Sequence, residues 1–186
     1  ILAMPEKTDR KPCLVIAQHG IGSSPEKTFG LDDEKGLYHG YGRELIKDGF
    51  AVLSPFNLAT SPYRNRIQRM AAMIGTTLPG LELKRVQILL DYIFAKGEVD
   101  TKGAGIWGIS LGGFATQLWM PLEKRIIAGV SCAWFNSRLL KMIIPDPRYS
   151  CFLNTQEEHA FFKNWLSEFT DSDLISLVCP RAFLAQ

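Results

Sequence analysis

The chain has 186 residues, of which 46% are hydrophobic and 22% are charged, and its formal net charge is +2. This length suits a single domain, 1–186, with a sizeable core, and the small net charge gives no electrostatic reason to expect nucleic acid or an anionic membrane as a partner. The longest strongly apolar stretch, 126–135, is far shorter than the ~20 residues that span a bilayer, and the N-terminus shows no signal-peptide pattern. We therefore expect a cytoplasmic domain.

Short apolar runs that suit buried strands alternate with helical patterns along the chain. The predicted strands cover 1–4, 13–17, 50–53, 104–109, 126–133 and 181–185. The predicted helices cover 37–47, 66–74, 81–95, 111–120, 157–169 and 171–178, the last with Asp171 as its cap. This alternation predicts an α/β fold with a mostly parallel sheet and helices on both faces.

Two stretches depart from the alternation. Residues 57–65 are rich in turn formers and predict a loop. Residues 136–169 contain two prolines and many aromatic side chains, and we expect them to form an insertion above the sheet that walls a substrate pocket.

The stretch 108–112 fits G-x-S-x-G, the nucleophile elbow of α/β-hydrolases, with Ser110 as its serine. A strand-like run precedes the motif and a helical run that ends at Pro121 follows it, which is the context that the motif requires. The Ser110 hydroxyl would attack a carbonyl carbon, and the backbone N–H of Leu111 would face the resulting oxyanion. The alternative is that Ser110 is only a small residue at a tight turn.

Residues 103–108 also match G-x-G-x-x-G, the dinucleotide-binding fingerprint. That fingerprint must follow a strand and open a helix, whereas here a polar stretch precedes it and 106–109 has the character of a strand. Glu123 lies at about the distance expected of a ribose-binding carboxylate, but distance alone is a weak signal. Nucleotide binding is therefore the weaker interpretation.

A Gly/Ser-rich loop, 18–24, follows the predicted strand 13–17. In an α/β-hydrolase the loop after this strand donates the second oxyanion N–H. The N–H near Ile21 is the expected donor, with Gly20 as the next choice. His19 is then expected to organise the loop through hydrogen bonds rather than to act as a base.

Three stretches, 13–20, 41–55 and 108–113, resemble the α/β-hydrolase superfamily. They look most like its dienelactone-hydrolase and acetyl-xylan-esterase-like branches, and 177–184 is similar to the strand that precedes the catalytic acid there. The resemblance covers nearly the whole chain. It implies an α/β-hydrolase fold and a serine hydrolase of carboxylic esters with Ser110 as the nucleophile.

The family order of catalytic residues is serine, acid, histidine, and a family-like acid and histidine would follow 181–185, where the chain stops. The chain also begins without methionine and ends within an apolar run, so we expect a fragment of a longer protein. His159 alone among the histidines follows Ser110. We expect it to be solvated or at the pocket rim, and a triad with Asp146 or Glu157 is the alternative. Without a base, Ser110 is a weak nucleophile at neutral pH.

The remaining polar and aromatic candidates have structural interpretations. Arg64 and Arg66 could meet an anionic substrate, but we expect them to be solvated surface side chains. Five aromatic residues are expected to pack in the core or the insertion, with some lining an acyl pocket: Trp134, Phe135, Phe161, Phe162 and Trp165.

The four cysteines, Cys13, Cys132, Cys151 and Cys179, show no metal or redox spacing. Because Cys13 and Cys132 lie in or beside apolar runs, we expect both to be buried thiols.

The sequence thus predicts a hydrolase that cleaves a small-molecule ester through an acyl-enzyme on Ser110, with Leu111 and Ile21 as oxyanion donors and no metal or organic cofactor. One alternative is a non-catalytic relative that binds small molecules or partners through the same pocket. Another is an acyltransferase or peptidase, since a fold does not determine a reaction. The acyl group, the alcohol group and the oligomeric state are not determined by the sequence.

Overall fold

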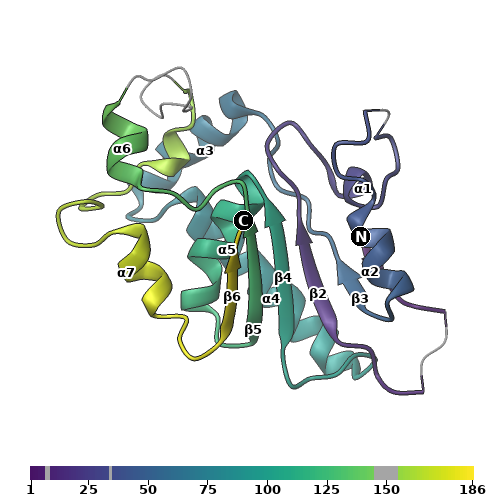
Figure 1. Cartoon of the computed structure of the whole chain (residues 1–186). Helices are drawn as coiled ribbons and strands as arrows, with labels where there is room; N and C mark the ends of the chain where they lie inside the picture. The colour runs from purple at the N-terminus through teal and green to yellow at the C-terminus, as the bar shows by residue number, and fades with distance from the viewer. Residues whose placement is uncertain (7–8, 34, 145–154) are drawn as a thin grey trace.

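The computed structural model describes residues 1–6, 9–33, 35–144 and 155–186. One six-stranded sheet runs through these residues in the order β1-β3-β2-β4-β5-β6 (Figure 1). β1 is antiparallel to β3 and every other neighbouring pair is parallel. The strands are β1 (Leu2–Ala3), β2 (Leu14–Gln18), β3 (Ala51–Leu53), β4 (Ala104–Ile109), β5 (Ile126–Cys132) and β6 (Ala182–Ala185). The mostly parallel α/β sheet predicted from the sequence is confirmed.

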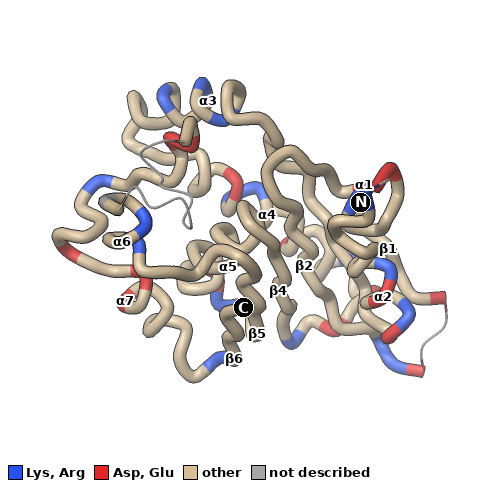
Figure 2. Tube along the Cα trace, turned by 45° about the horizontal axis from the view of Figure 1, so that its top comes forward, with Lys and Arg blue, Asp and Glu red and all other residues tan. Residues whose placement is uncertain are grey.

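From β2 onward, helices separate successive strands, as predicted, although α1 and α6 are not among the predicted helices. The helices are α1 (Pro25–Thr28), α2 (Tyr41–Lys47), α3 (Ser61–Met73), α4 (Leu78–Lys96), α5 (Leu111–Leu122), α6 (Arg138–Ile143), the short 3₁₀ helix η2 (Glu158–Ala160) and α7 (Asp171–Ser176). None of the described helices is long and apolar enough to cross a bilayer. Basic and acidic residues are interspersed along the described part of the trace (Figure 2).

Successive side chains of a strand point to opposite faces of the sheet, and the central strands divide their apolar residues accordingly. On one face, Ile16 of β2 and Ile106 of β4 belong to a core cluster with residues of α4 and α5. On the other face, Ala17 of β2 and Trp107 of β4 cluster with Tyr41 of α2. Helices therefore cover both faces at the centre of the sheet (Figure 1).

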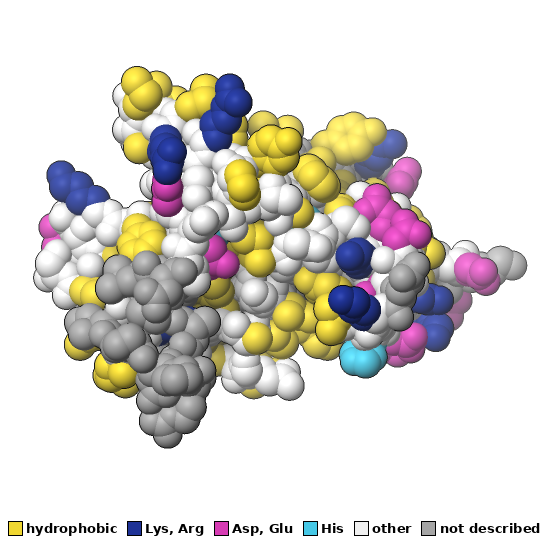
Figure 3. Space-filling view, turned by 90° about the horizontal axis from the view of Figure 1, so that it is seen from above, with side chains coloured by type: hydrophobic (Ala, Val, Ile, Leu, Met, Phe, Trp, Pro, Cys, Tyr) yellow, Lys and Arg dark blue, Asp and Glu magenta, His cyan; other side chains and the backbone are white. Residues whose placement is uncertain are grey.

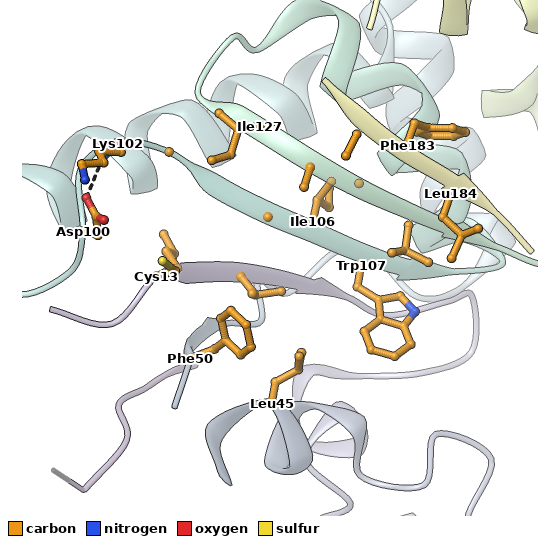
Figure 4. A pocket seen from close by; sticks show the side chains of 18 residues that line it. Cys13, Leu45, Phe50, Asp100, Lys102, Ile106, Trp107, Ile127, Phe183 and Leu184 are labelled. Atoms are coloured by element: carbon orange, nitrogen blue, oxygen red, sulfur yellow. Dashed lines mark hydrogen bonds between the residues drawn. The ribbon is translucent and has the colours of Figure 1, made fainter. Parts of the chain in front are cut away.

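Over β5 and β6 the described residues leave the second face open. An apolar trough of about 650 Å³ lies there (Figure 4). Ile127 and Leu184 line it and are 46% and 56% exposed. Parallel sheets are normally buried on both faces, so an exposed apolar trough is unusual on such a sheet.

The expectation of buried thiols is wrong for Cys13 and holds only in part for Cys132. Cys13 precedes β2, lines the trough and is exposed. Cys132 is half-buried, and its sulfur accepts a hydrogen bond from Trp107 Nε1 at 3.2 Å. The exposure of Cys13 follows from the uncovered face, which the local apolar pattern does not reveal.

Three helices begin elsewhere than predicted, among them α4, which begins at Leu78 rather than at residue 81. α2 begins at Tyr41 rather than at residue 37, because Gly40 before it has a φ of 60° and interrupts helical geometry. α3 begins at Ser61, so much of the predicted loop 57–65 is helical. Pro62 lies in the first turn of α3, where a missing backbone N–H costs nothing, so this proline starts the helix rather than preventing it.

The predicted helix 157–169 is wrong. Only η2 is helical there, and Asn164 and Leu166 have φ values of 68° and 81°, which no helix accommodates. The cap of α7 is Thr170 rather than Asp171, since the Thr170 hydroxyl accepts a hydrogen bond from the Asp173 N–H at 3.2 Å. The described parts of 136–169 lie beyond the carboxyl ends of the strands (Figure 1). That these residues form an insertion stays a prediction.

Candidate active site

Ser110 stands at a sharp turn between β4 and α5. Its φ and ψ are 56° and −115°, a conformation that is rare and strained for a residue with a Cβ. The turn is held on both sides, because the Ser110 N–H donates to Cys132 O at 2.9 Å and Ser110 O accepts from the Phe114 N–H at 3.0 Å. Backbone strain of this kind persists only where the surroundings enforce it, and it is frequent at functional sites.

The glycines of the motif are required by the close approach of backbone segments. A Cβ on Gly108 would lie 2.0 Å from Gly112 O, and a Cβ on Gly112 would lie 2.1 Å from Gln18 O. No side chain fits at either position. The G-x-S-x-G spacing therefore reflects the contact of the elbow with itself and with the end of β2.

The loop after β2 brings backbone N–H groups beside Ser110. A Cβ on Gly20 would stand 3.4 Å from Ser110 Cβ, so this loop touches the serine. The Gly20 N–H is already bonded to the Tyr38 hydroxyl at 2.9 Å. The Ile21 N–H, by contrast, makes no backbone hydrogen bond to any described residue. Ile21 is thus better placed than Gly20 to be the free donor, and its role stays a prediction.

Leu111 is the first residue of α5, and the first N–H groups of a helix have no partner within the helix. Leu111 and Ile21 also belong to one apolar cluster. A substrate oxygen beside Ser110 could therefore meet two backbone N–H groups in an apolar setting. This geometry is compatible with an oxyanion hole, which itself remains a prediction.

His19 organises the loop, as expected from the sequence. Its side chain is fully buried. Its Nδ1 pairs with Gly20 O at 2.9 Å, and its Nε2 accepts a hydrogen bond from the Asn57 N–H at 3.1 Å. Nδ1 must then carry the proton, and burial lowers the pKa of the ring and keeps it neutral. Both nitrogens are engaged, so His19 is not free to act as a base.

An apolar cluster lies next to the elbow. Phe114 packs on Trp134 with ring centroids 4.7 Å apart, and Phe162 and Trp165 extend the cluster. The remaining two predicted packing residues lie elsewhere, since Phe135 packs against Phe183 of β6 and Phe161 is 37% exposed. Seen from above, Lys and Arg side chains lie around the margin of this end of the molecule, and hydrophobic and uncharged side chains fill much of its middle (Figure 3).

The expectation that His159 is solvated or at the pocket rim is wrong. His159 is fully buried, and its Nδ1 accepts a hydrogen bond from Arg64 Nε at 3.3 Å. Burial and the nearby guanidinium lower the pKa of His159 to about 3. A histidine bonded to a cation is a poor base, so this geometry does not support a triad with Glu157. Asp146 lies outside the described residues.

Arg64 is also buried rather than solvated. It belongs to α3, and its guanidinium forms a bidentate ion pair with Glu82 of α4, with Nη1 2.7 Å from Oε1 and Nη2 3.2 Å from Oε2. Arg66, two residues farther along α3, is exposed as expected. Sequence reasoning missed the ion pair, although Glu82 lies four residues from both Leu78 and Val86 on the apolar face of α4, which is a signal that could have found it.

A second buried ion pair joins Arg138 of α6 to Asp171 of α7, with Nε 3.1 Å from Oδ2. The Arg138 guanidinium also lies 3.6 Å from the centroid of the Trp165 ring. This pair ties the segment after β5 to α7. Within the described ranges, no group of three or more His, Cys, Asp or Glu side chains is arranged to hold a metal ion.

Searches against protein-family models and curated proteins find no match. Among solved structures, a "putative acetyl xylan esterase" from Bacteroides fragilis matches with a TM-score of 0.82 and 16% identity, over 100% of this chain and 54% of that one. The fluorophosphonate-binding serine hydrolase FphF of Staphylococcus aureus matches with a TM-score of 0.57 and 16% identity, over 95% of this chain and 64% of that one.

A 2,6-dihydroxy-pseudo-oxynicotine hydrolase also matches, with a TM-score of 0.56 and 20% identity, over 85% of this chain and 41% of that one. This chain thus spans roughly half the length of the proteins that it matches. At these identities the likeness concerns the fold alone.

Proposed function

We propose that this chain, which has the α/β-hydrolase fold, carries the nucleophile of a serine hydrolase that cleaves carboxylic esters. The observation that carries the proposal is the conformation of Ser110, a serine with a φ of 56° between a parallel strand and a helix. Strained backbone of this kind is a marker of functional sites. Ser110 directly follows the carboxyl end of β4, at the edge of the sheet where ligands of open α/β sheets bind.

In the proposed reaction, Ser110 Oγ forms a bond to the ester carbonyl carbon, and the carbonyl oxygen becomes a tetrahedral oxyanion. The N–H groups of Leu111 and Ile21 donate hydrogen bonds to that oxygen. The bond to the alcohol oxygen then breaks, which leaves an acyl-enzyme, and a water molecule releases the acid. The small-molecule ester is the only partner that this chemistry requires.

The Ser110 hydroxyl proton must pass to a general base and from there to the leaving alcohol oxygen. His19 and His159 are both buried and bonded elsewhere, so neither serves this purpose. We propose that the base lies outside the described residues, because in the order typical of α/β-hydrolases an acid and a histidine follow the nucleophile. The proposal therefore concerns the full encoded protein.

The test is covalent labelling with a fluorophosphonate probe, a reagent class that FphF binds. The full encoded protein is expected to be labelled at Ser110, and Ser110→Ala is expected to lose both labelling and hydrolysis of short-chain esters while keeping its thermal midpoint. Ser176→Ala, a serine of α7 that lies away from the elbow, serves as the control. Folded wild-type protein that is not labelled would favour the non-catalytic binding protein instead.

A further inference from the structure

Tyr38, in the loop between α1 and α2, reaches the candidate active site. A Cβ built on Gly20 would stand 2.7 Å from the Tyr38 hydroxyl oxygen and 3.4 Å from Ser110 Cβ. The phenol and the serine therefore approach each other across the smallest residue of the oxyanion loop. No local sequence pattern points to Tyr38, because this contact depends on a loop 18 residues farther along the chain.

The hydrogen bonding of the Tyr38 hydroxyl leaves its proton available. A phenol can accept hydrogen bonds and donate one. The Tyr38 oxygen accepts from the Gly20 N–H at 2.9 Å. Among the described residues, the hydrogen bond from the Gly20 N–H is the one found for this hydroxyl, so the hydroxyl donates to none of them. The acceptor is thus occupied while the donor beside Ser110 is free.

Tyr38 is held in place by one ring contact and one backbone hydrogen bond. It stacks on Tyr41 with centroids 6.3 Å apart and an interplanar angle of 29°, and Tyr41 in turn packs on Trp107 of β4 at 5.3 Å. The Tyr38 N–H donates to Asp33 Oδ2 at 3.1 Å. A donor fixed before the reaction gains strength when charge develops near it, because little reorganisation is needed.

We propose that the Tyr38 hydroxyl is a third donor to the oxyanion that forms when Ser110 attacks an ester. This proposal rests on the proposed function. The hydrogen bond strengthens as the carbonyl oxygen becomes an alkoxide, and no proton is transferred. The bond from the Gly20 N–H polarises the phenol toward donation, so Gly20 acts through Tyr38 rather than on the substrate.

The first experiment compares Tyr38→Phe with wild type in the full encoded protein, with Tyr92→Phe on the exposed side of α4 as the matched control. Removing one oxyanion donor costs about 10²-fold in kcat. We expect a loss of that order in kcat for Tyr38→Phe, little change in KM, and a parallel loss in the rate of fluorophosphonate labelling. Tyr92→Phe should behave as wild type. A kcat within twofold of wild type for Tyr38→Phe would overturn the proposal.

The second experiment separates donation from loop support by placing 3-fluorotyrosine at position 38, at a pH where the fluorinated phenol stays neutral. Fluorination makes the hydroxyl a better donor and a poorer acceptor. Donation to the oxyanion predicts a kcat equal to or above that of wild type, whereas mere support of the Gly20 N–H predicts a lower one and would overturn the proposal. This readout also remains informative if Tyr38→Phe fails to fold. Absent labelling of wild-type Ser110 would overturn the proposed function and this inference together.

Discussion

Arg64→Met is expected to destabilise the protein strongly, because it leaves a carboxylate buried without its partner. The side chains of Arg64 and Glu82 are 0% and 7% exposed. Two hydrogen bonds join them, at 2.7 and 3.2 Å, and Arg64 Nη1 also donates to Leu58 O at 2.9 Å. Removing the guanidinium therefore deprives Glu82 of both the countercharge and the donors that compensate its burial.

Removing one partner of a buried pair costs about 3–5 kcal/mol. In a chain of this size each kcal/mol lowers the thermal midpoint by roughly 2–4 °C, so Arg64→Met is expected to lower it by roughly 6–20 °C. The double variant with Arg64→Met and Glu82→Leu removes both charges. It is expected to recover most of the loss, because apolar residues of similar volume often replace a buried ion pair at little cost.

The measurement is urea unfolding followed by tryptophan fluorescence, with the thermal midpoint as a second readout. Arg66→Met is the control, since Arg66 lies on the same helix and is exposed, and it should change the free energy of unfolding by less than about 0.5 kcal/mol. A single variant as stable as wild type would refute the reasoning, and so would a double variant no more stable than the single one.

Three further outcomes follow from the structure. Gly112→Ala is expected to abolish ester hydrolysis and to destabilise the fold, since the added Cβ would lie 2.1 Å from Gln18 O. A variant with wild-type kcat and thermal midpoint would show that the elbow is packed less tightly than in the structure. The pKa of His159 is about 3 in the folded protein and near 6.5 in an unfolded chain. As the pH drops, the unfolded state therefore takes up a proton before the folded state does. The free energy of unfolding should then fall between about pH 6.5 and pH 3, by up to about 1.4 kcal/mol per pH unit. His159→Gln should flatten that slope in denaturant titrations from pH 7 to pH 4, whereas the same change at exposed His39 should not. Finally, the 186-residue chain by itself should bind an apolar dye in the trough on its sheet and enhance the fluorescence of that dye. Ile127 lines the trough and is 46% exposed, so Ile127→Lys should reduce the enhancement. Equal dye binding by the variant would exclude the trough as the binding surface.

The strands, the main helices and the elbow could be predicted because local patterns determine them. Apolar runs of four to eight residues separated by helical patterns are sufficient to indicate a parallel sheet. The elbow can be recognised in the sequence because a Cβ on Gly108 or Gly112 would lie about 2 Å from the backbone of a neighbouring segment. Glycine is therefore required at these two positions, at a fixed spacing around Ser110. The organising role of His19 also follows from its place in the loop after β2.

The tertiary structure alone decided which polar groups are buried and what they contact. Arg64 and His159 are 95 residues apart, and neither has a neighbour in sequence that predicts their hydrogen bond. Tyr38 reaches Gly20 across 18 residues, and the exposure of Cys13 depends on a sheet face formed by strands from both halves of the chain. Local patterns report the side-chain periodicity of one element, whereas burial and pairing of charged groups depend on which elements meet. For that reason the turn that carries Ser110 could be predicted from the sequence, and the buried polar contacts around it could not.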